Sequence, residues 1–172
     1  MAKELQSSIQ MTLAGRATDA LDLSTPEDAL SKTFRDTLAS GLGLDQADVL
    51  WHDRRALGVA TEELCLTATL TDGLGDTVTF NRVKCIAIFN NLLTVGAFIE
   101  VGGQVGVPAD TFDSWVNADT DAVIIGPGGC FLLWNPSLAA YTSTGAPDTL
   151  LIGSNNAAGS YDIIIIGTSA AP

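Results

Sequence analysis

The sequence is poor in positive charge, and all of it lies in the first half of the chain. There are 8 Lys and Arg residues against 20 Asp and Glu residues, so the formal net charge is −12. No Lys or Arg follows Lys84, whereas acidic residues continue to Asp162. Because such a surface repels phosphate backbones and anionic lipids, we expect neither nucleic acid nor a membrane as a partner.

Other signals are also missing. No apolar run approaches the length of a transmembrane helix, and the N-terminus lacks the pattern of a secretory signal, so we expect synthesis and folding in a cytoplasm. Cys65, Cys85 and Cys130 are odd in number and lack CxxC spacing, which argues against a disulfide framework or a zinc site and favours buried free thiols. We expect no cofactor and no metal.

Charged residues make up only 16% of the chain and aromatic residues 6%. Much of the surface is therefore uncharged, and such a surface is often covered by a partner. At 172 residues, the chain fits one domain of ordinary size or one domain that carries an arm.

Residues 26–40 are expected to form an amphipathic helix. Ser24 or Thr25 is a candidate N-cap, Pro26 suits the first helical position, and Gly41 suits the stop. Apolar residues and threonines between 29 and 38 recur at helical spacing. The preceding residues 5–13, "LQSSIQMTL", are interpreted as an arm or an edge strand.

From Glu63 onward, short runs rich in Val, Ile and Thr alternate with turns rich in Gly, Asn, Asp and Pro. The absence of a second helical pattern argues against a parallel βαβ sheet. About eight strands at this spacing predict a mainly β fold, an antiparallel β-sandwich of jelly-roll type. We predict an N-terminal arm and helix over 1–50 and a β-sandwich domain over 51–172. The candidate strands are "LCLTATL", "TVTFNRVKCIAIFN", "LTVGAFIEVGG", "DSWVN", "AVIIGPGGCFLLWNP", "AYTSTG", "DTLLIGSNN" and "SYDIIIIGTS".

The segment "VIIGPGGCFLLW", Val123 to Trp134, raises the question of a phosphate-binding loop. Such a loop opens a helix or carries Gly-Lys-Ser/Thr, but here a strand-like run and an Asn-Pro turn follow. We therefore predict a tight turn between two strands.

Candidate chemistry is sparse, and we expect no enzyme. His52 and Asp53 are adjacent, so on an extended chain they point to opposite faces and cannot act as a base and its orienting partner. The acidic loop Asp110, Asp113, Asp119 and Asp121 is the best cation candidate, although its spacing is not that of an EF-hand and a solvated loop is favoured. The three tryptophans are interpreted as core or interface residues rather than a sugar platform.

The order of segments "DLSTPEDAL", "LASGLGLDQADVLWHDRRAL", "EELCLTATLTDGLGDTVTFNRVKCIAIFN", "VIIGPGGCFLLWNP", "GAPDTLLIGSNN" and "YDIIIIGTS" resembles that of small virion proteins of tailed bacteriophages. The resemblance covers about residues 20–169. It implies a head decoration (cement) protein with a jelly-roll-like body that assembles as a trimer or dimer on the major capsid protein. It carries over no functional residues.

We therefore expect a virion structural protein, assembled in the bacterial cytoplasm, that bridges neighbouring capsomers. The alternatives are a tail or fibre-base component and a lectin-like module that uses the acidic loop and Trp115. Residues expected at capsid or subunit contacts are Phe34, Arg35, Trp51, Arg54 and Arg55.

Overall fold

The described part of the chain is built from strands. The computed structural model describes residues 4–20, 23–58, 61–103, 111–116, 118, 120–143, 148–155 and 159–172. These residues include no helix, and so none with the length and apolar character of a membrane span. The strands are β1 (Ser7–Thr18), β2 (Glu27–Ser40), β3 (Gln46–Ala47), β4 (Val49–Leu57), β5 (Glu62–Cys65), β6 (Leu70–Thr71), β7 (Thr77–Val78), β8 (Arg82–Asn90), β9 (Ile99–Gly102), β10 (Ala122–Ile125), β11 (Cys130–Trp134), β12 (Tyr141–Thr142), β13 (Thr149–Ser154) and β14 (Gly159–Thr168).

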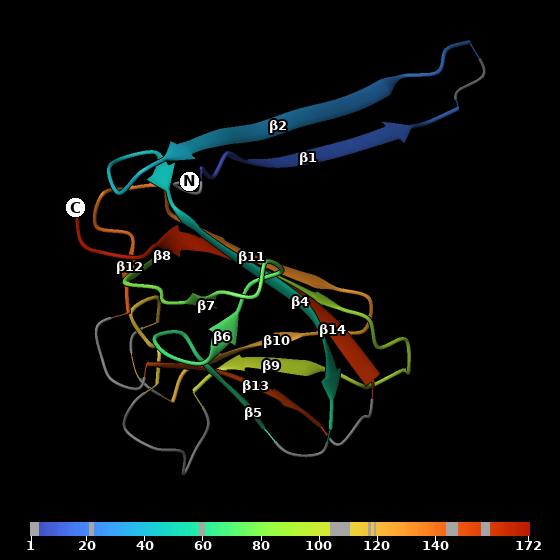
Figure 1. The fold of residues 1–172 in the computed structure, drawn as a ribbon. Helices are drawn as coiled ribbons and strands as arrows, with labels where there is room; N and C mark the ends of the chain where they lie inside the picture. Colours follow the sequence, from blue (N-terminus) through green and yellow to red (C-terminus); the bar gives the residue numbers. More distant parts are fainter. Residues whose placement is uncertain are drawn as a thin grey trace.

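The body of the molecule contains two antiparallel sheets (Figure 1). The first, which we call the β8 sheet, has the order β11-β8-β14-β4, with β12 also paired to β8. The second, the β9 sheet, has the order β10-β9-β13-β5. β6 and β7 form a separate antiparallel pair. The prediction of a mainly β, antiparallel chain is confirmed.

The main core contains residues from both sheets. Strand alternation directs Tyr161, Ile163 and Ile165 of β14 into this core, while Ile164 between them lies on the opposite face of the β8 sheet and is half-buried. Ile99 of β9 and Ile152 of β13 come from the β9 sheet and belong to the same buried cluster. Burial of such aliphatic side chains contributes about 1.5–3 kcal/mol each to stability.

The predicted helix over 26–40 is wrong, because Glu27–Ser40 is the strand β2. β2 pairs along its whole length with β1, from Ser7 opposite Leu38 to Thr18 opposite Glu27. The two strands form a long hairpin that projects from the body, and we call it the arm (Figure 1). The cap-like residues before β2 belong instead to the turn of this hairpin, where the amide of Asp19 donates to the carbonyl of Pro26.

The base of the arm packs on the side of the β8 sheet that faces away from the β9 sheet. Here a second buried cluster joins Ile9 and Leu38 of the arm to Cys85 and Ile166 of the β8 sheet. The division at residues 50 and 51 stays a prediction, since this cluster connects the two parts.

The glycine-rich segment is a turn between two strands, as predicted. β10 belongs to the β9 sheet and β11 to the β8 sheet, so the turn carries the chain from one sheet to the other. Asn90 holds this turn, because its side-chain amide donates to the carbonyls of Ile125 and Gly126 at 2.9 and 3.0 Å. The run "DSWVN" was wrongly predicted as a strand, since its described residues form a turn closed by Val116 and Asp113.

Candidate functional site

One face of the arm carries its large apolar side chains together with Asp28, Lys32 and Asp36, and the other face is polar. Residues directly opposite each other in an antiparallel pair share a face. The pairs Met11 with Phe34 and Gly15 with Leu30 therefore lie on one face, and Thr12 with Thr33 lies on the other. The polar face is held by a 3.0 Å contact between the Thr12 and Thr33 hydroxyls and by a 2.7 Å ion pair between Arg16 and Glu27. We call Met11, Leu13, Leu30 and Phe34, all exposed, the arm face.

A buried lysine fastens the loop that follows the arm. Lys84 of β8 is fully buried, and its Nζ donates to the carbonyls of Gly43 and Pro136 at 2.6 and 3.3 Å. Burial lowers the pKa of Lys84, and the nearby carboxylate of Asp45 opposes this shift. The cation is thus used as a clamp between the arm's base and the body.

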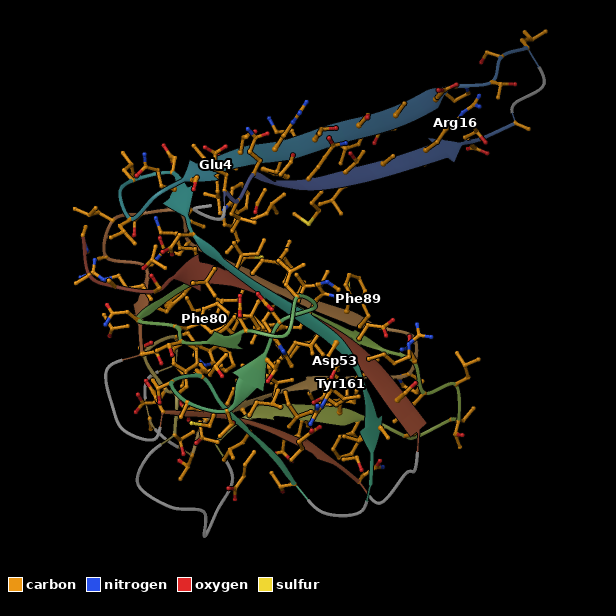
Figure 2. The ribbon with its side chains drawn as sticks, in the orientation of Figure 1. Glu4, Arg16, Asp53, Phe80, Phe89 and Tyr161 are labelled. Atoms are coloured by element: carbon orange, nitrogen blue, oxygen red, sulfur yellow. The ribbon has the colours of Figure 1, made fainter. Side chains whose placement is uncertain are left out.

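The outward face of the β8 sheet carries a second exposed apolar surface. Phe89 is directly opposite Cys130, and Leu132 lies on the same face of β11. All three are exposed, and we call them the body patch. Figure 2 shows Phe89 on the side of the body that is nearer to the arm. Sequence reasoning expected Cys130 to be buried, and this was wrong because the residue points away from the core.

Arg54 and Asp162 border the body patch. The guanidinium donates from Nε and one terminal nitrogen to the two carboxylate oxygens, at 2.6 and 2.8 Å. This hydrogen bonding, together with that from Asn91, lowers the pKa of Asp162 to about 2. His52 also lies on the outward face, opposite Ile164, whereas Asp53 lies opposite Ile163 on the inward face. The expected separation of His52 from Asp53 is confirmed by this register.

A partly buried charged network links the two sheets. Arg55 of β4 donates to Glu62 of β5 through two nitrogens, one of them at 2.7 Å, and to Asp53 at 3.0 Å. The Tyr161 hydroxyl donates to the other oxygen of Glu62 at 2.6 Å. Hydrogen bonding to Glu62 raises the pKa of Arg55. Burial raises the pKa of Tyr161, and the hydrogen bond to Glu62 raises it further.

Beside this network is a cavity of about 290 Å³, lined by Trp51, Asp53, Arg55, Glu63, Leu64, Thr69, Leu70 and Thr71. Tyr161 stays protonated at neutral pH, so its phenolate is not a base, and the Arg55 guanidinium is engaged by its two carboxylates. The network therefore joins β4, β5 and β14 and provides no poised nucleophile.

The acidic loop is only partly within the described residues. Asp110 and Asp119 lie outside them. Asp113 accepts the Val116 amide through its backbone carbonyl, and the Asp121 carboxylate accepts the Ala118 amide at 3.0 Å. Trp115, expected beside a sugar site, is half-buried against Phe131 and donates to the Phe112 carbonyl. Among the described residues no cluster of three or more His, Cys, Asp or Glu side chains is placed to hold a metal ion.

The residues predicted at contacts fall in different places. Phe34 belongs to the arm face, and Arg35 lies on the polar face of the arm, opposite Gln10. Trp51 is 3% exposed and donates to the Thr71 carbonyl, so it belongs to the core of the single chain, and its contact role stays a prediction. Arg54 is paired with Asp162 on the outward face of the β8 sheet, and the partly buried Arg55 is paired with Glu62 and Asp53.

Sequence reasoning missed the body patch and the clamp at Lys84. It noted the alternation in residues 5–13, which is the signal for the arm face, but it gave β2 a helical period. The arm face and the body patch are the most prominent candidates for an interaction surface in the described structure. No protein-family model, curated protein or solved structure matches this chain.

Proposed function

We propose that the chain is a non-enzymatic virion structural protein. It binds the outer surface of a phage capsid and stabilises it by bridging neighbouring capsomers as an oligomer. The observation that carries the proposal is the projecting arm, whose apolar face lies uncovered beyond its base. A body with such an arm suits lattice assembly, because each arm reaches past its own body and repetition multiplies modest contacts.

We further propose that the body is a β-sandwich of jelly-roll type. If the eight strands of its two sheets are counted along the chain, the β8 sheet has the order sixth-third-eighth-first and the β9 sheet the order fifth-fourth-seventh-second. Consecutive strands thus mostly alternate between the sheets, which supports two interleaved Greek keys. Jelly rolls occur in viral capsid proteins and in lectins, so this support for a virion role is an analogy at the level of the fold.

The chemistry of the described residues also supports an assembly role over an enzyme. The His52 and Asp53 side chains lie on opposite faces of β4, and the Arg55 network is satisfied internally. The proposal places the protein in the virion, with the major capsid protein and other copies of itself as partners.

The test uses capsids stripped of accessory proteins. Purified protein is added to the shells, and the bound amount and the temperature of shell disruption are measured. We expect saturation at a fixed ratio to the capsid protein and a higher disruption temperature, with an unrelated acidic protein as the control. Binding to isolated tails but not to shells would replace the head assignment with a tail or fibre-base role, and binding to neither would overturn the virion proposal.

A further inference from the structure

The arm face and the body patch flank the same buried cluster. At the base of the arm, Ile9 and Leu38 already pack against Cys85 and Ile166 of the β8 sheet. Outward from this contact, the arm continues with Phe34 at 41% exposure and Leu30 at 63%. The arm face and the body patch therefore continue the apolar contact at the base of the arm, and both are exposed in the single chain.

We propose that the arm face of one copy packs against the body patch of a second copy of this chain. In the simplest arrangement the contact is reciprocal, so that each arm lies across the neighbouring body. Figure 1 shows the distal part of the arm reaching beyond its own body, where it is free to cover a neighbour.

The charge of the arm favours another copy as the partner. β1 and β2 together carry three basic residues and three acidic ones, so their formal charge is zero in a chain of net charge −12. A neutral arm meets little repulsion from the acidic body of another copy. On the arm face, Lys32 stands between Asp28 and Asp36, and the neighbouring body offers Arg54 and Asp162 beside its patch. The six charged residues of β1 and β2 are Arg16, Lys32, Arg35, Glu27, Asp28 and Asp36.

The arm is long enough for the upper limit of this contact to reach the size of a specific interface, with Ile9 and Leu38 at its base already packed on the same chain. A strand of this length spans about 40 Å and two paired strands are about 10 Å wide, so one face of the arm covers about 400 Å². A reciprocal exchange involves two arm faces and the two surfaces beneath them, at most about 1,600 Å² in total, which is the standard size of a specific interface. An isolated hairpin is also only marginally stable in water, so a covering partner stabilises the arm itself.

The experiment compares two adjacent substitutions with the same added charge. Leu30→Asp changes the arm face, whereas Ser31→Asp changes the polar face and is the matched control. Mass is measured by light scattering over a range of concentrations, with circular dichroism to confirm folding. The alkylation rate of Cys130 is followed in parallel, because the partner arm should shield this thiol of the body patch.

We expect the wild-type chain to form an oligomer with a slowly alkylated Cys130. Leu30→Asp should raise the dissociation constant roughly tenfold or more, since it replaces an apolar side chain of the contact by a charged one, and should speed alkylation, while Ser31→Asp changes neither. Phe89→Asp on the body patch should have the same effect as Leu30→Asp, and it carries the test if the arm variant does not fold.

A wild-type chain that is monomeric at every concentration, or an oligomer equally insensitive to all three substitutions, would overturn the inference. This inference rests on the proposed function, which requires an oligomer, but the experiments can contradict the interface and the virion role independently. A monomer that saturates shells leaves the capsid role standing without this interface. An arm-dependent oligomer that ignores both shells and tails leaves the interface standing without the virion role.

Discussion

At the scale of single residues, the end of β2 depends on a glycine. Gly41 has φ +143°, a conformation that side-chain-bearing residues rarely adopt, and a Cβ at this position would collide with the Gln46 side chain. Gln46 itself accepts the amide of Gly43 at 2.8 Å. The chain needs this tight turn to return from the arm to the body.

Gly41→Ala should therefore destabilise the protein by about 1–3 kcal/mol, mainly through backbone strain, because the end of the Gln46 side chain can move aside. Gly15→Ala in the middle of the arm is the control, because a Cβ there has no neighbour within 4 Å. Urea unfolding of the two variants gives the comparison. An equal effect of the two substitutions would show that the turn tolerates a side chain.

Cys85 gives a prediction for alkaline pH. Burial raises the pKa of its thiol from 9.0 to about 11. Between these values the unfolded chain loses this proton while the folded chain keeps it, so the free energy of unfolding falls as pH rises from 9 to 11. The loss amounts to about 2 kcal/mol.

The measurement compares urea unfolding of the wild type and Cys85→Ala at pH values across this interval. The difference between the two removes the contributions of Lys84 and Tyr161, whose shifted pKa values also make stability depend on pH in the alkaline range. Parallel curves for the two proteins would contradict the assignment of this slope to Cys85.

At the scale of elements, β2 shows why local pattern misled the sequence analysis. Leu30, Phe34 and Leu38 are four residues apart, a spacing that fits one face of a helix and also every second position on one face of a strand. The cap-like residues around Pro26 favoured the helix. Pairing with β1 favours the strand over the helix, because β1 pairs with β2 along its whole length. A window of local sequence does not contain that partner.

The link between the two sheets is also an element-scale feature. Tyr161 is fully buried in β14 and donates to Glu62 in β5 at 2.6 Å. Tyr161→Phe removes this donor from a half-buried carboxylate, and we expect a loss of about 1.5–3 kcal/mol in the free energy of unfolding.

Tyr141→Phe is the matched control for this substitution. The Tyr141 side chain is half-buried, and its hydroxyl makes no hydrogen bond with the described residues. Its loss should change the urea midpoint little. If the two substitutions cost the same, the hydroxyl of Tyr161 does not hold the sheets together.

At the scale of the whole molecule, strand content was predictable but the exposed apolar surface was not. Runs such as "YDIIIIGTS" combine high β propensity with flanking turns, and they form strands as expected. The body patch is different. Phe89, Cys130 and Leu132 lie within apolar runs whose composition predicts burial. Only the pairing of β11 with β8 shows that these side chains share the outward face.

Net charge provides the whole-molecule prediction. Copies of a chain with net charge −12 repel one another. Raising the salt concentration from about 0.01 M to about 0.1 M shortens the Debye length from about 30 Å to about 10 Å, so self-association should strengthen. Light scattering at the two salt concentrations checks this expectation. Weaker association in salt would mean that attraction between opposite charges dominates the contact.

The position of β14 has a consequence for how the protein is made. The ten residues Gly159–Thr168 lie between β4 and β8 and pair with both, although those two strands come much earlier in the sequence. The arm joins residues that are near in sequence, so it can form early, whereas the β8 sheet needs contacts between distant parts of the chain. While β14 is still inside the ribosome, the β8 sheet lacks the strand that joins β4 to β8, so the body stays unfinished until β14 emerges.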